Sequence, residues 1–423
     1  MTAREQAGTA QEAERWLLGR ELFGMRFGLE RMRRLLTVLG SPQDAFRTIH
    51  VVGTNGKSST VRMTAAILEA HGIRTGSYLS PHLVSFRERI RIGDADLGEE
   101  DFARAIERVR RAAEKVDRGL VEGDRVTQFE ALTAAAYSEL ARQGVEVAVV
   151  EAGLGGRWDA TNVIASEVVV LTNVGLEHTR WLGPTVRDIA REKLAVVKPG
   201  PAPPALVLGG DLHPDAFLEA HAAQAARVVV APESIASLEI GARGTFQRRN
   251  FALARTAAEA LLGQLDEAAV RAAAARIRVP GRFEVIAEEP LTILDGAHNP
   301  SGMRALADSL TDVDRPLVVV LSVLDDKDAT SMLRALLPHA DALVCTSNAN
   351  PRALSPATLA SLTAQLGGAC SEMDPIVEPD PHRALARARD LAGPEGAVLA
   401  TGSIYLVADL HRPIGATGPR STL

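Results

Sequence analysis

The chain has 423 residues, of which 46% are hydrophobic and 24% charged, and its formal net charge is −6. This length is typical of two or three globular domains, and the acidic balance gives no support to a nucleic-acid partner. Two cysteines, Cys345 and Cys370, are too few for a disulfide framework or a four-cysteine zinc site. No apolar run reaches the ~20 residues of a membrane span and no apolar signal region opens the chain, so we expect a cytoplasmic protein without a membrane partner.

Residues 12–18 and 29–39 have apolar residues at helical spacing, and strands then alternate with helices. We expect strands at 50–52, 75–78, 88–92, 145–150, 167–171, 205–208 and 228–230. We expect helices at 61–71, 99–116, 127–141, 185–197, 249–262 and 266–275. This alternation predicts a mostly parallel sheet covered by helices on both faces.

A second α/β unit follows Val279-Pro280-Gly281-Arg282, which is the best linker candidate. Its expected strands are 291–294, 316–321, 342–345 and 398–400. The sequence therefore predicts a P-loop-type domain over residues 1–279, a linker over 280–283, and a smaller Rossmann-like domain over 284–423.

The clearest motif is Gly53-Thr54-Asn55-Gly56-Lys57-Ser58, between an expected strand and an expected helix. Glycines let backbone N–H groups surround phosphate oxygens at a helix N-terminus, and Lys57 would reach the β- and γ-phosphates. Ser58 would lie near a metal ion. The general pattern wants glycine at position 51, where Val51 stands. The alternative is an ordinary glycine turn with an exposed lysine.

Ligands of parallel sheets lie beyond the carboxyl ends of the strands. The expected strand ends carry Ser80, Glu151 and His178 in the first unit, and Asp295 and His298 in the second. A hydroxyl, a carboxylate and an imidazole can share a divalent cation with phosphate oxygens and water. Histidine is an unusual Mg²⁺ ligand, so by residue type alone His178 is first a general base or a hydrogen-bonding residue. Glu151 could instead bond to the glycine-rich turn that follows it.

Other motifs have structural explanations. Asn299 before Pro300 fits a helix cap, and Thr127 with Glu130 fits a capping box. Gly153-Leu154-Gly155-Gly156 is no dinucleotide fingerprint, because Trp158 stands where a third glycine is needed. There is no G-x-S-x-G nucleophile elbow, which leaves a serine hydrolase without support. We expect both cysteines to be buried small hydrophobes.

Several stretches in order resemble one family. They are Gly53–Lys57, Ser80–Leu83 with Glu88–Arg91, Thr127–Glu130, Glu151–Asn162, Gly175–His178 with Trp181–Gly183, Glu192-Lys193, Pro280–Phe283, Asp295–Pro300 and Gly402–Leu406. From about Met25 to Val407 the chain resembles the folylpolyglutamate synthase/dihydrofolate synthase family of the Mur ligase superfamily.

The resemblance implies an ATP-dependent, ADP-forming amide ligase of folate biosynthesis. It would add L-glutamate to dihydropteroate, to (tetrahydro)folyl-(poly)glutamate, or to both, through an acyl phosphate. It implies ATP, two Mg²⁺ ions and small-molecule substrates, and we expect a monomer. We also expect closure of the two domains to complete the active site.

Residue roles follow from the same resemblance. The nucleotide residues would be Thr54, Asn55, Gly56, Lys57, Ser58, Asn250, Arg282 and Asp295. Ser80, Glu151 and His178 would hold Mg²⁺, and Lys193 would be carried as a carbamate. Lys57, Lys193, His178 and His298 would serve catalysis, with His298 positioning glutamate. The pterin residues would be Met25, Arg26, Phe27, Thr127, Gln128, Phe129, Glu130, Trp158, Asp159 and Ala160.

The chain departs from the family in three places. Ser58 stands where glycine is usual, Glu177 replaces the commoner aspartate, and Leu194-Ala195 follows Lys193 where Ala-Gly is usual. Two alternatives remain. Another Mur-superfamily amino-acid ligase, such as a cell-wall enzyme, would carry an additional N-terminal domain, which the short segment before Gly53 argues against. A non-catalytic nucleotide-binding relative is disfavoured by the intact Lys57, Glu151, His178 and Lys193.

Overall fold

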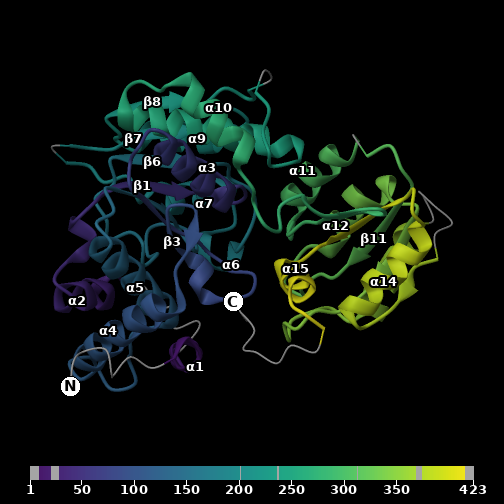
Figure 1. Cartoon of the computed structure of the whole chain (residues 1–423), viewed down its shortest axis with the longest axis horizontal. Helices are drawn as coiled ribbons and strands as arrows, with labels where there is room; N and C mark the ends of the chain where they lie inside the picture. The colour runs from purple at the N-terminus through teal and green to yellow at the C-terminus, as the bar shows by residue number, and fades with distance from the viewer. Residues whose placement is uncertain are drawn as a thin grey trace. The chain divides into compact units, whose positions relative to one another are not determined.

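A computed structural model describes residues 9–20, 28–200, 202–235, 238–311, 313–367 and 374–414. The chain divides into two compact units (Figure 1). Unit 1 lies within Met1–Glu239 and Arg249–Ile277, and unit 2 within Ile240–Arg248 and Arg278–Thr422. The segment Ile240–Arg248 thus belongs to unit 2 although unit 1 precedes and follows it in sequence.

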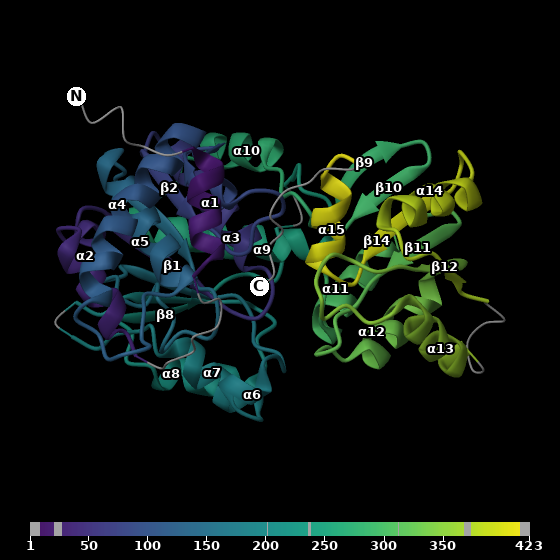
Figure 2. The same cartoon turned by 90° about the horizontal axis from the view of Figure 1, so that it is seen from below.

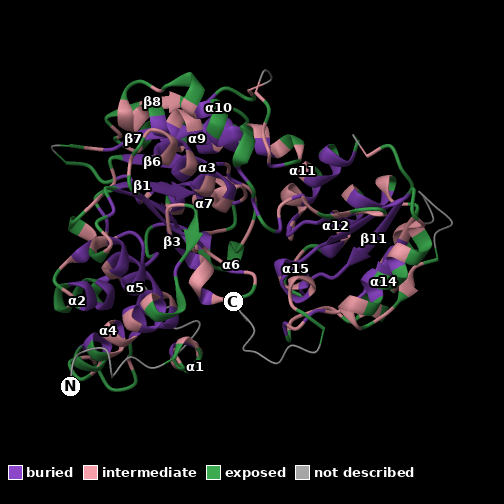
Figure 3. Ribbon diagram, in the orientation of Figure 1, coloured by how far each residue is buried: buried purple, intermediate pink, exposed green. Residues whose placement is uncertain are grey.

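Unit 1 is built on an eight-stranded sheet in the order β4-β3-β2-β5-β1-β6-β7-β8. The strands are β1 (Arg47–Val52), β2 (Thr75–Tyr78), β3 (Ile90–Ile92), β4 (Ala95–Asp96), β5 (Val147–Glu151), β6 (Val168–Leu171), β7 (Ala205–Leu208) and β8 (Arg227–Val230). The six from β2 to β8 run parallel, while β3 and β4 add an antiparallel edge. Apart from the exposed Arg47, the central strands β1, β5 and β6 are buried (Figure 3), as expected for a parallel sheet covered on both faces.

Of the described helices, ten lie wholly or, for α9, mostly in unit 1. They are α1 (Ala10–Leu18), α2 (Glu30–Val38), α3 (Lys57–Ala70), α4 (Glu99–Asp117), α5 (Gln128–Arg142), α6 (Thr179–Leu182), α7 (Val186–Leu194), α8 (Pro214–Ala222), α9 (Thr245–Leu262) and α10 (Glu267–Arg276). One core joins α1, α2, α4 and α5 to β2 and β5. A second core joins α7 and α8 to β1, β6 and β7. Two separate cores thus hold the strands whose ends carry the site.

Unit 2 has a six-stranded sheet in the order β13-β12-β11-β14-β10-β9 (Figure 2). The strands are β9 (Glu284–Glu288), β10 (Leu291–Leu294), β11 (Leu317–Leu321), β12 (Ala342–Cys345), β13 (Ile376–Val377) and β14 (Ala397–Thr401). The helices are α11 (Pro300–Leu310), α12 (Ala329–Leu336), α13 (Pro356–Gly367), α14 (Pro381–Ala392) and α15 (Ile404–His411). All pairs are parallel except β9 with β10.

The predicted fold class is confirmed: two α/β units, each with a mostly parallel sheet and helices. The expected strand over 88–92 is wrong in its first half. Phe86–Arg89 forms a 3₁₀ turn, and only Ile90–Ile92 is strand. The Glu88 carboxylate accepts hydrogen bonds from the backbone N–H groups of Leu83, Val84 and Ser85, which holds this turn.

Two further expectations concern cysteines and membranes. Cys345 is buried and free, as expected, while Cys370 lies outside the described residues. Among the described helices, none is long and apolar enough to cross a membrane.

Candidate active site

The glycine loop joins β1 to α3 at the carboxyl edge of the first sheet. Gly53 has φ 151° and Gly56 has φ 81°, in the region that favours glycine. A Cβ atom on Gly53 would lie 1.8 Å from Thr172 Oγ1, and one on Gly56 would lie 2.4 Å from Asn250 Oδ1. Both glycines are therefore required by the backbone conformation and by close neighbours. The predicted nucleotide residue Asn250, on α9, is thereby placed beside the loop.

The loop is fastened to the segment that follows β6. Thr54 N donates to Asn173 O and Asn55 N donates to Asn173 Oδ1, both at 2.9 Å. Thr172 Oγ1 donates to Asn55 O at 2.6 Å. Since β6 pairs directly with β1, this neighbouring strand end holds the loop in shape before any ligand arrives. Sequence reasoning missed Asn173 and Thr172, although their place just after an expected strand was a usable signal.

Two lysines converge on the loop. Lys57 Nζ donates to Gly53 O and Thr54 O, each at 3.0 Å. Lys193 Nζ, from α7, donates to the same Gly53 O at 2.8 Å and to Glu177 Oε1 at 3.0 Å. Two ammonium groups on one carbonyl form a cationic site that phosphate oxygens could occupy with stronger, charge-assisted hydrogen bonds.

The Lys193–Glu177 pair is buried and its two groups shift in pKa. Burial lowers the pKa of Lys193, partly opposed by the Glu177 carboxylate. Burial alone would raise the pKa of Glu177, but the charges of Lys193, Lys57 and His178 outweigh it and lower that pKa to about 2.

Glu151 ends β5, next to the loop, and its side chain is buried. Ser58 Oγ donates to Glu151 Oε1 at 3.0 Å, and Ser80 N donates to Glu151 Oε2 at 3.2 Å. The structure thus brings Ser58, Ser80 and Glu151 together from α3, the end of β2 and the end of β5. Their oxygen atoms are of the kind that Mg²⁺ prefers.

His178 is the third predicted metal residue. It is exposed, has φ 47° in the left-handed region, and precedes α6 as its N-cap. Within the described ranges, no group of three or more His, Cys, Asp or Glu side chains could hold a metal ion. The oxygen atoms of Ser58, Ser80 and Glu151 fit Mg²⁺, which takes few protein ligands and keeps phosphate oxygens and water.

The predicted pterin residues fall into three segments. Thr127 caps α5 in a capping box with Glu130, as predicted. Arg31 Nε also donates to both Glu130 carboxylate oxygens at 3.2 Å, and Gln128 Nε2 donates to Leu17 O at 3.0 Å. The Glu130 carboxylate and the Gln128 side chain therefore already have hydrogen-bond partners within unit 1. Met25, Arg26 and Phe27 lie outside the described residues.

Phe129 and Asp159 both contact the glycine turn that follows β5. A Cβ on Gly153 would lie 2.6 Å from Phe129 Cζ, so the Phe129 ring packs on the glycine turn after β5. Asp159 is buried in that turn and accepts from Leu154 N at 2.8 Å and Thr161 N at 3.0 Å. Burial raises the pKa of Asp159 against the opposing effect of these hydrogen bonds. Trp158 is 48% exposed, while Ala160 is buried.

Unit 2 contributes residues around the end of β10. Asp295 is buried, and its carboxylate accepts from Phe283 N and Ala297 N, each at 2.8 Å. Burial raises the pKa of Asp295, and the Arg282 charge opposes this. Arg282 Nη1 donates to Gly281 O at 2.9 Å. His298 Nδ1 bonds to Gly296 O at 2.8 Å and therefore carries a proton, because a carbonyl can only accept. Asn299 caps α11, as predicted.

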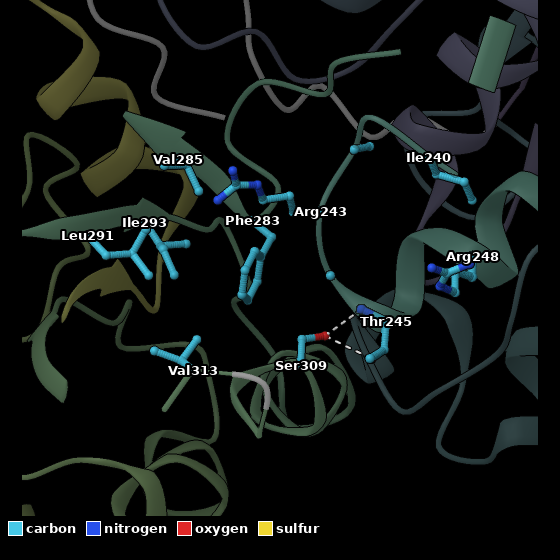
Figure 4. A pocket seen from close by; sticks show the side chains of 12 residues that line it. Ile240, Arg243, Thr245, Arg248, Phe283, Val285, Leu291, Ile293, Ser309 and Val313 are labelled. Carbon is cyan, nitrogen blue, oxygen red and sulfur yellow. Dashed lines mark hydrogen bonds between the residues drawn. The ribbon is translucent and has the colours of Figure 1, made fainter. Parts of the chain in front are cut away.

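Unit 2 also contains a pocket of about 340 Å³ (Figure 4). The apolar side chains of Phe283, Val285 and Ile293 face it, and Thr245 bonds to Ser309 at its border. None of the residues that line it belongs to the predicted site.

Comparisons with known proteins identify the family of this chain. Residues 51–285 match the Mur ligase middle domain, and residues 281–404 match the Mur ligase glutamate ligase domain. The chain is 31% identical to the dihydrofolate synthase/folylpolyglutamate synthase of Bacillus subtilis, over 95% of this chain and 98% of that protein.

Solved structures are similar over almost the whole chain. The folylpolyglutamate synthase of Mycobacterium tuberculosis complexed with ADP has a TM-score of 0.88 at 31% identity, covering 97% of this chain and 99% of that one. The bifunctional folylpolyglutamate synthase/dihydrofolate synthase with Mn, AMPPNP and L-glutamate bound has a TM-score of 0.82 at 29% identity, covering 96% and 98%. The chain therefore belongs to the Mur ligase superfamily and, within it, to the dihydrofolate synthase/folylpolyglutamate synthase family.

Proposed function

We propose that this protein is an ATP-dependent, ADP-forming ligase that joins L-glutamate to dihydropteroate, to (tetrahydro)folyl-(poly)glutamate, or to both. Relatives of this family are named for these two activities, and similar structures bind ADP, or a nucleotide analogue with manganese and L-glutamate. The single observation that carries the proposal is that Lys57 Nζ and Lys193 Nζ both donate to the Gly53 carbonyl. This carbonyl follows β1, next to the end of β5, where Glu151 lies.

The proposed reaction has two steps. An oxygen of the acceptor's carboxylate attacks the γ-phosphorus of ATP, the bond from that phosphorus to the bridging oxygen breaks, and ADP leaves. The amine of glutamate then attacks the carbonyl carbon of the acyl phosphate, inorganic phosphate leaves, and the amine loses its proton as the amide forms. Both steps need the phosphates held still while negative charge is balanced.

The loop residues supply that positioning. We propose that the phosphates bind to the loop at Thr54, Asn55, Gly56 and Ser58. The hydrogen bonds of the loop to Asn173 fix its shape. We propose that Lys57 leaves the carbonyls of Gly53 and Thr54 and donates to phosphate oxygens instead. Asn250 contributes from unit 1, whereas Arg282 and Asp295 belong to unit 2. We propose that all three bind the nucleotide.

Ser80, Glu151 and His178 would hold Mg²⁺, which supplies charge neutralisation at the phosphates when bound. We propose a second Mg²⁺ and a carbamate on Lys193. Only a neutral amine reacts with carbon dioxide, and the lowered pKa of Lys193 increases the neutral fraction. A carbamate would place a second anion beside Glu177, so it should form together with cation binding.

We propose that the acceptor's ring system binds near Met25–Phe27, Thr127–Glu130 and Trp158–Ala160. Phe129 packs on Gly153, and Asp159 accepts from Leu154 N in the same turn, which supports a shared site for the last two segments. His298 is proposed to position glutamate. The cytoplasmic location and the monomeric state remain predictions from the sequence.

The test is an assay of ADP release by the purified protein with ATP, Mg²⁺, L-glutamate and either dihydropteroate or tetrahydrofolate. We expect ADP only when glutamate and at least one acceptor are both present. Absence of ADP with every folate-type acceptor would refute the proposal. ADP release with dihydropteroate would show dihydrofolate synthase activity, and ADP release with tetrahydrofolate would show folylpolyglutamate synthase activity.

A further inference from the structure

Ser58 follows Lys57 in the glycine loop, at a position where the resemblance leads us to expect glycine. It is the second residue of α3, which begins at Lys57. Its hydroxyl donates to Glu151 Oε1 at 3.0 Å. A glycine at this position has no side chain to make that hydrogen bond.

The second oxygen of the same carboxylate is also held. Ser80 N donates to Glu151 Oε2 at 3.2 Å, from the end of β2. Glu151 is 1% exposed. Both carboxylate oxygens therefore have a donor from a different element, and the side chain is fixed from two sides.

A fixed carboxylate is a better cation ligand than a mobile one, because the rotational entropy is already lost before the ion arrives. Partners that orient a metal-binding side chain typically change metal affinity by about 10–100-fold when removed.

We propose that Ser58 is a positioning residue that orients Glu151 for a divalent cation bound with the nucleotide. The inference rests on the proposed function only in taking Glu151 as a metal-binding residue. It adds a role that the resemblance does not supply, since the family's usual glycine has no hydroxyl.

The test compares Ser58→Ala, Ser58→Thr and wild type for Mn²⁺ binding in the presence of ADP, followed by the electron paramagnetic resonance signal of free Mn²⁺. We expect about tenfold weaker Mn²⁺ binding in Ser58→Ala, and binding within about twofold of wild type in Ser58→Thr, which keeps the hydroxyl. The Mg²⁺ concentration for half-maximal ADP release should rise in Ser58→Ala by a similar factor.

Thr64→Ala is the matched control, because it removes another hydroxyl from α3, one that donates to Thr60 O at 2.7 Å. Its Mn²⁺ binding should equal that of wild type. Thermal unfolding without ligands should show that Ser58→Ala is folded. Should Ser58→Ala not fold, Ser58→Gly takes its place, with the same tenfold weakening expected.

Unchanged Mn²⁺ binding in Ser58→Ala, or equal weakening in Ser58→Ala and Ser58→Thr, would overturn the inference. The readout needs no acceptor or glutamate. A wild type that binds Mn²⁺ with ADP but releases none from ATP would refute the proposed function alone. A wild type that does not bind Mn²⁺ with ADP would overturn the positioning role itself.

Discussion

The carboxyl edges of the two sheets use their polar groups differently. In unit 1, the ammonium group of Lys57 donates to two backbone carbonyls, which are weaker partners than an anion. In unit 2, the Asp295 carboxylate already accepts two backbone N–H groups of its own turn. The first edge should therefore rearrange when phosphate binds, while in the second the Asp295 carboxylate already has its hydrogen bonds without a ligand.

The two edges also differ in how many elements build them. Ser80, Glu151, the glycine loop and the segment with Asn173 follow β2, β5, β1 and β6, which are neighbours in the first sheet. In unit 2 the predicted residues cluster around the end of β10 and the start of β9. A ligand at the first edge is therefore held by several strand ends, as is usual for parallel sheets.

The largest expected effect comes from removing the Lys57 ammonium group at the first edge. Lys57→Ala should lower ATP turnover by about 10²–10³-fold, because one charge-assisted contact to the transferring phosphoryl group is lost. Thermal unfolding should stay close to wild type, since Lys57 bonds only to its own loop. Lys115→Ala, an exposed lysine on α4, is the control. A wild-type kcat in Lys57→Ala would contradict the loop assignment.

The Lys193–Glu177 pair makes a pH-dependent prediction for the same edge. The folded pKa of Glu177, about 2, lies below its ordinary value, so its stabilisation is present at neutral pH and is lost as pH falls below about 4.5. Glu177→Gln should lower the free energy of unfolding at pH 7 by on the order of 1–3 kcal/mol. The difference in the free energy of unfolding between Glu177→Gln and wild type should shrink between pH 5 and pH 3, as measured by denaturant titrations.

Glu122→Gln, an exposed carboxylate, is the control and should show no such change with pH. A gap for Glu177→Gln that stays constant from pH 7 to pH 3 would mean that the carboxylate is not stabilised by its cationic neighbours.

Asp295→Asn tests the completeness of the second edge. An amide offers one acceptor oxygen, so one of the N–H groups of Phe283 and Ala297 loses its partner. The cost should be about 1–3 kcal/mol in the unfolding of unit 2. Asp314→Asn, on the surface of the same unit, should have no effect. Unchanged stability in Asp295→Asn would show that this turn does not depend on the carboxylate.

The smallest expected effect is the loss of stability when the Thr127 cap of α5 is removed. Thr127→Ala should cost about 1 kcal/mol of stability through loss of the α5 cap. Thr127→Ser keeps the capping hydroxyl and should recover that stability. If Thr127→Ser is as unstable as Thr127→Ala in denaturant titrations, the cap is not the source of the loss.

Much of the fold could be predicted from the sequence because parallel strands are short apolar runs between clear turns. Thr75–Tyr78, Ala205–Leu208, Leu291–Leu294 and Ala342–Cys345 are strands with the predicted bounds. Strand β9 was missed because Glu284–Glu288 is an antiparallel edge strand with no fully buried face. The membership of Ile240–Arg248 in unit 2 depends on contacts that are distant in sequence.

The site divides in a similar way. Ser80, Glu151 and the loop could be predicted as site residues from their place at the ends of strands, because the carboxyl ends of parallel strands share one edge of the sheet. Position could not show that Ser58 donates to Glu151, that Arg31 holds Glu130, or that Lys193 reaches Gly53. Such pairs join residues from separate elements, and their side-chain directions are set only when the sheet has formed.

The central claim is that the first edge holds ATP for phosphoryl transfer to a carboxylate. The most direct test uses an acceptor whose reacting carboxylate is labelled with ¹⁸O and measures the label in the phosphate released, by mass spectrometry. Transfer through an acyl phosphate predicts one ¹⁸O atom in each inorganic phosphate formed with glutamate present. Unlabelled phosphate, released at the same rate as the amide product, would contradict the account.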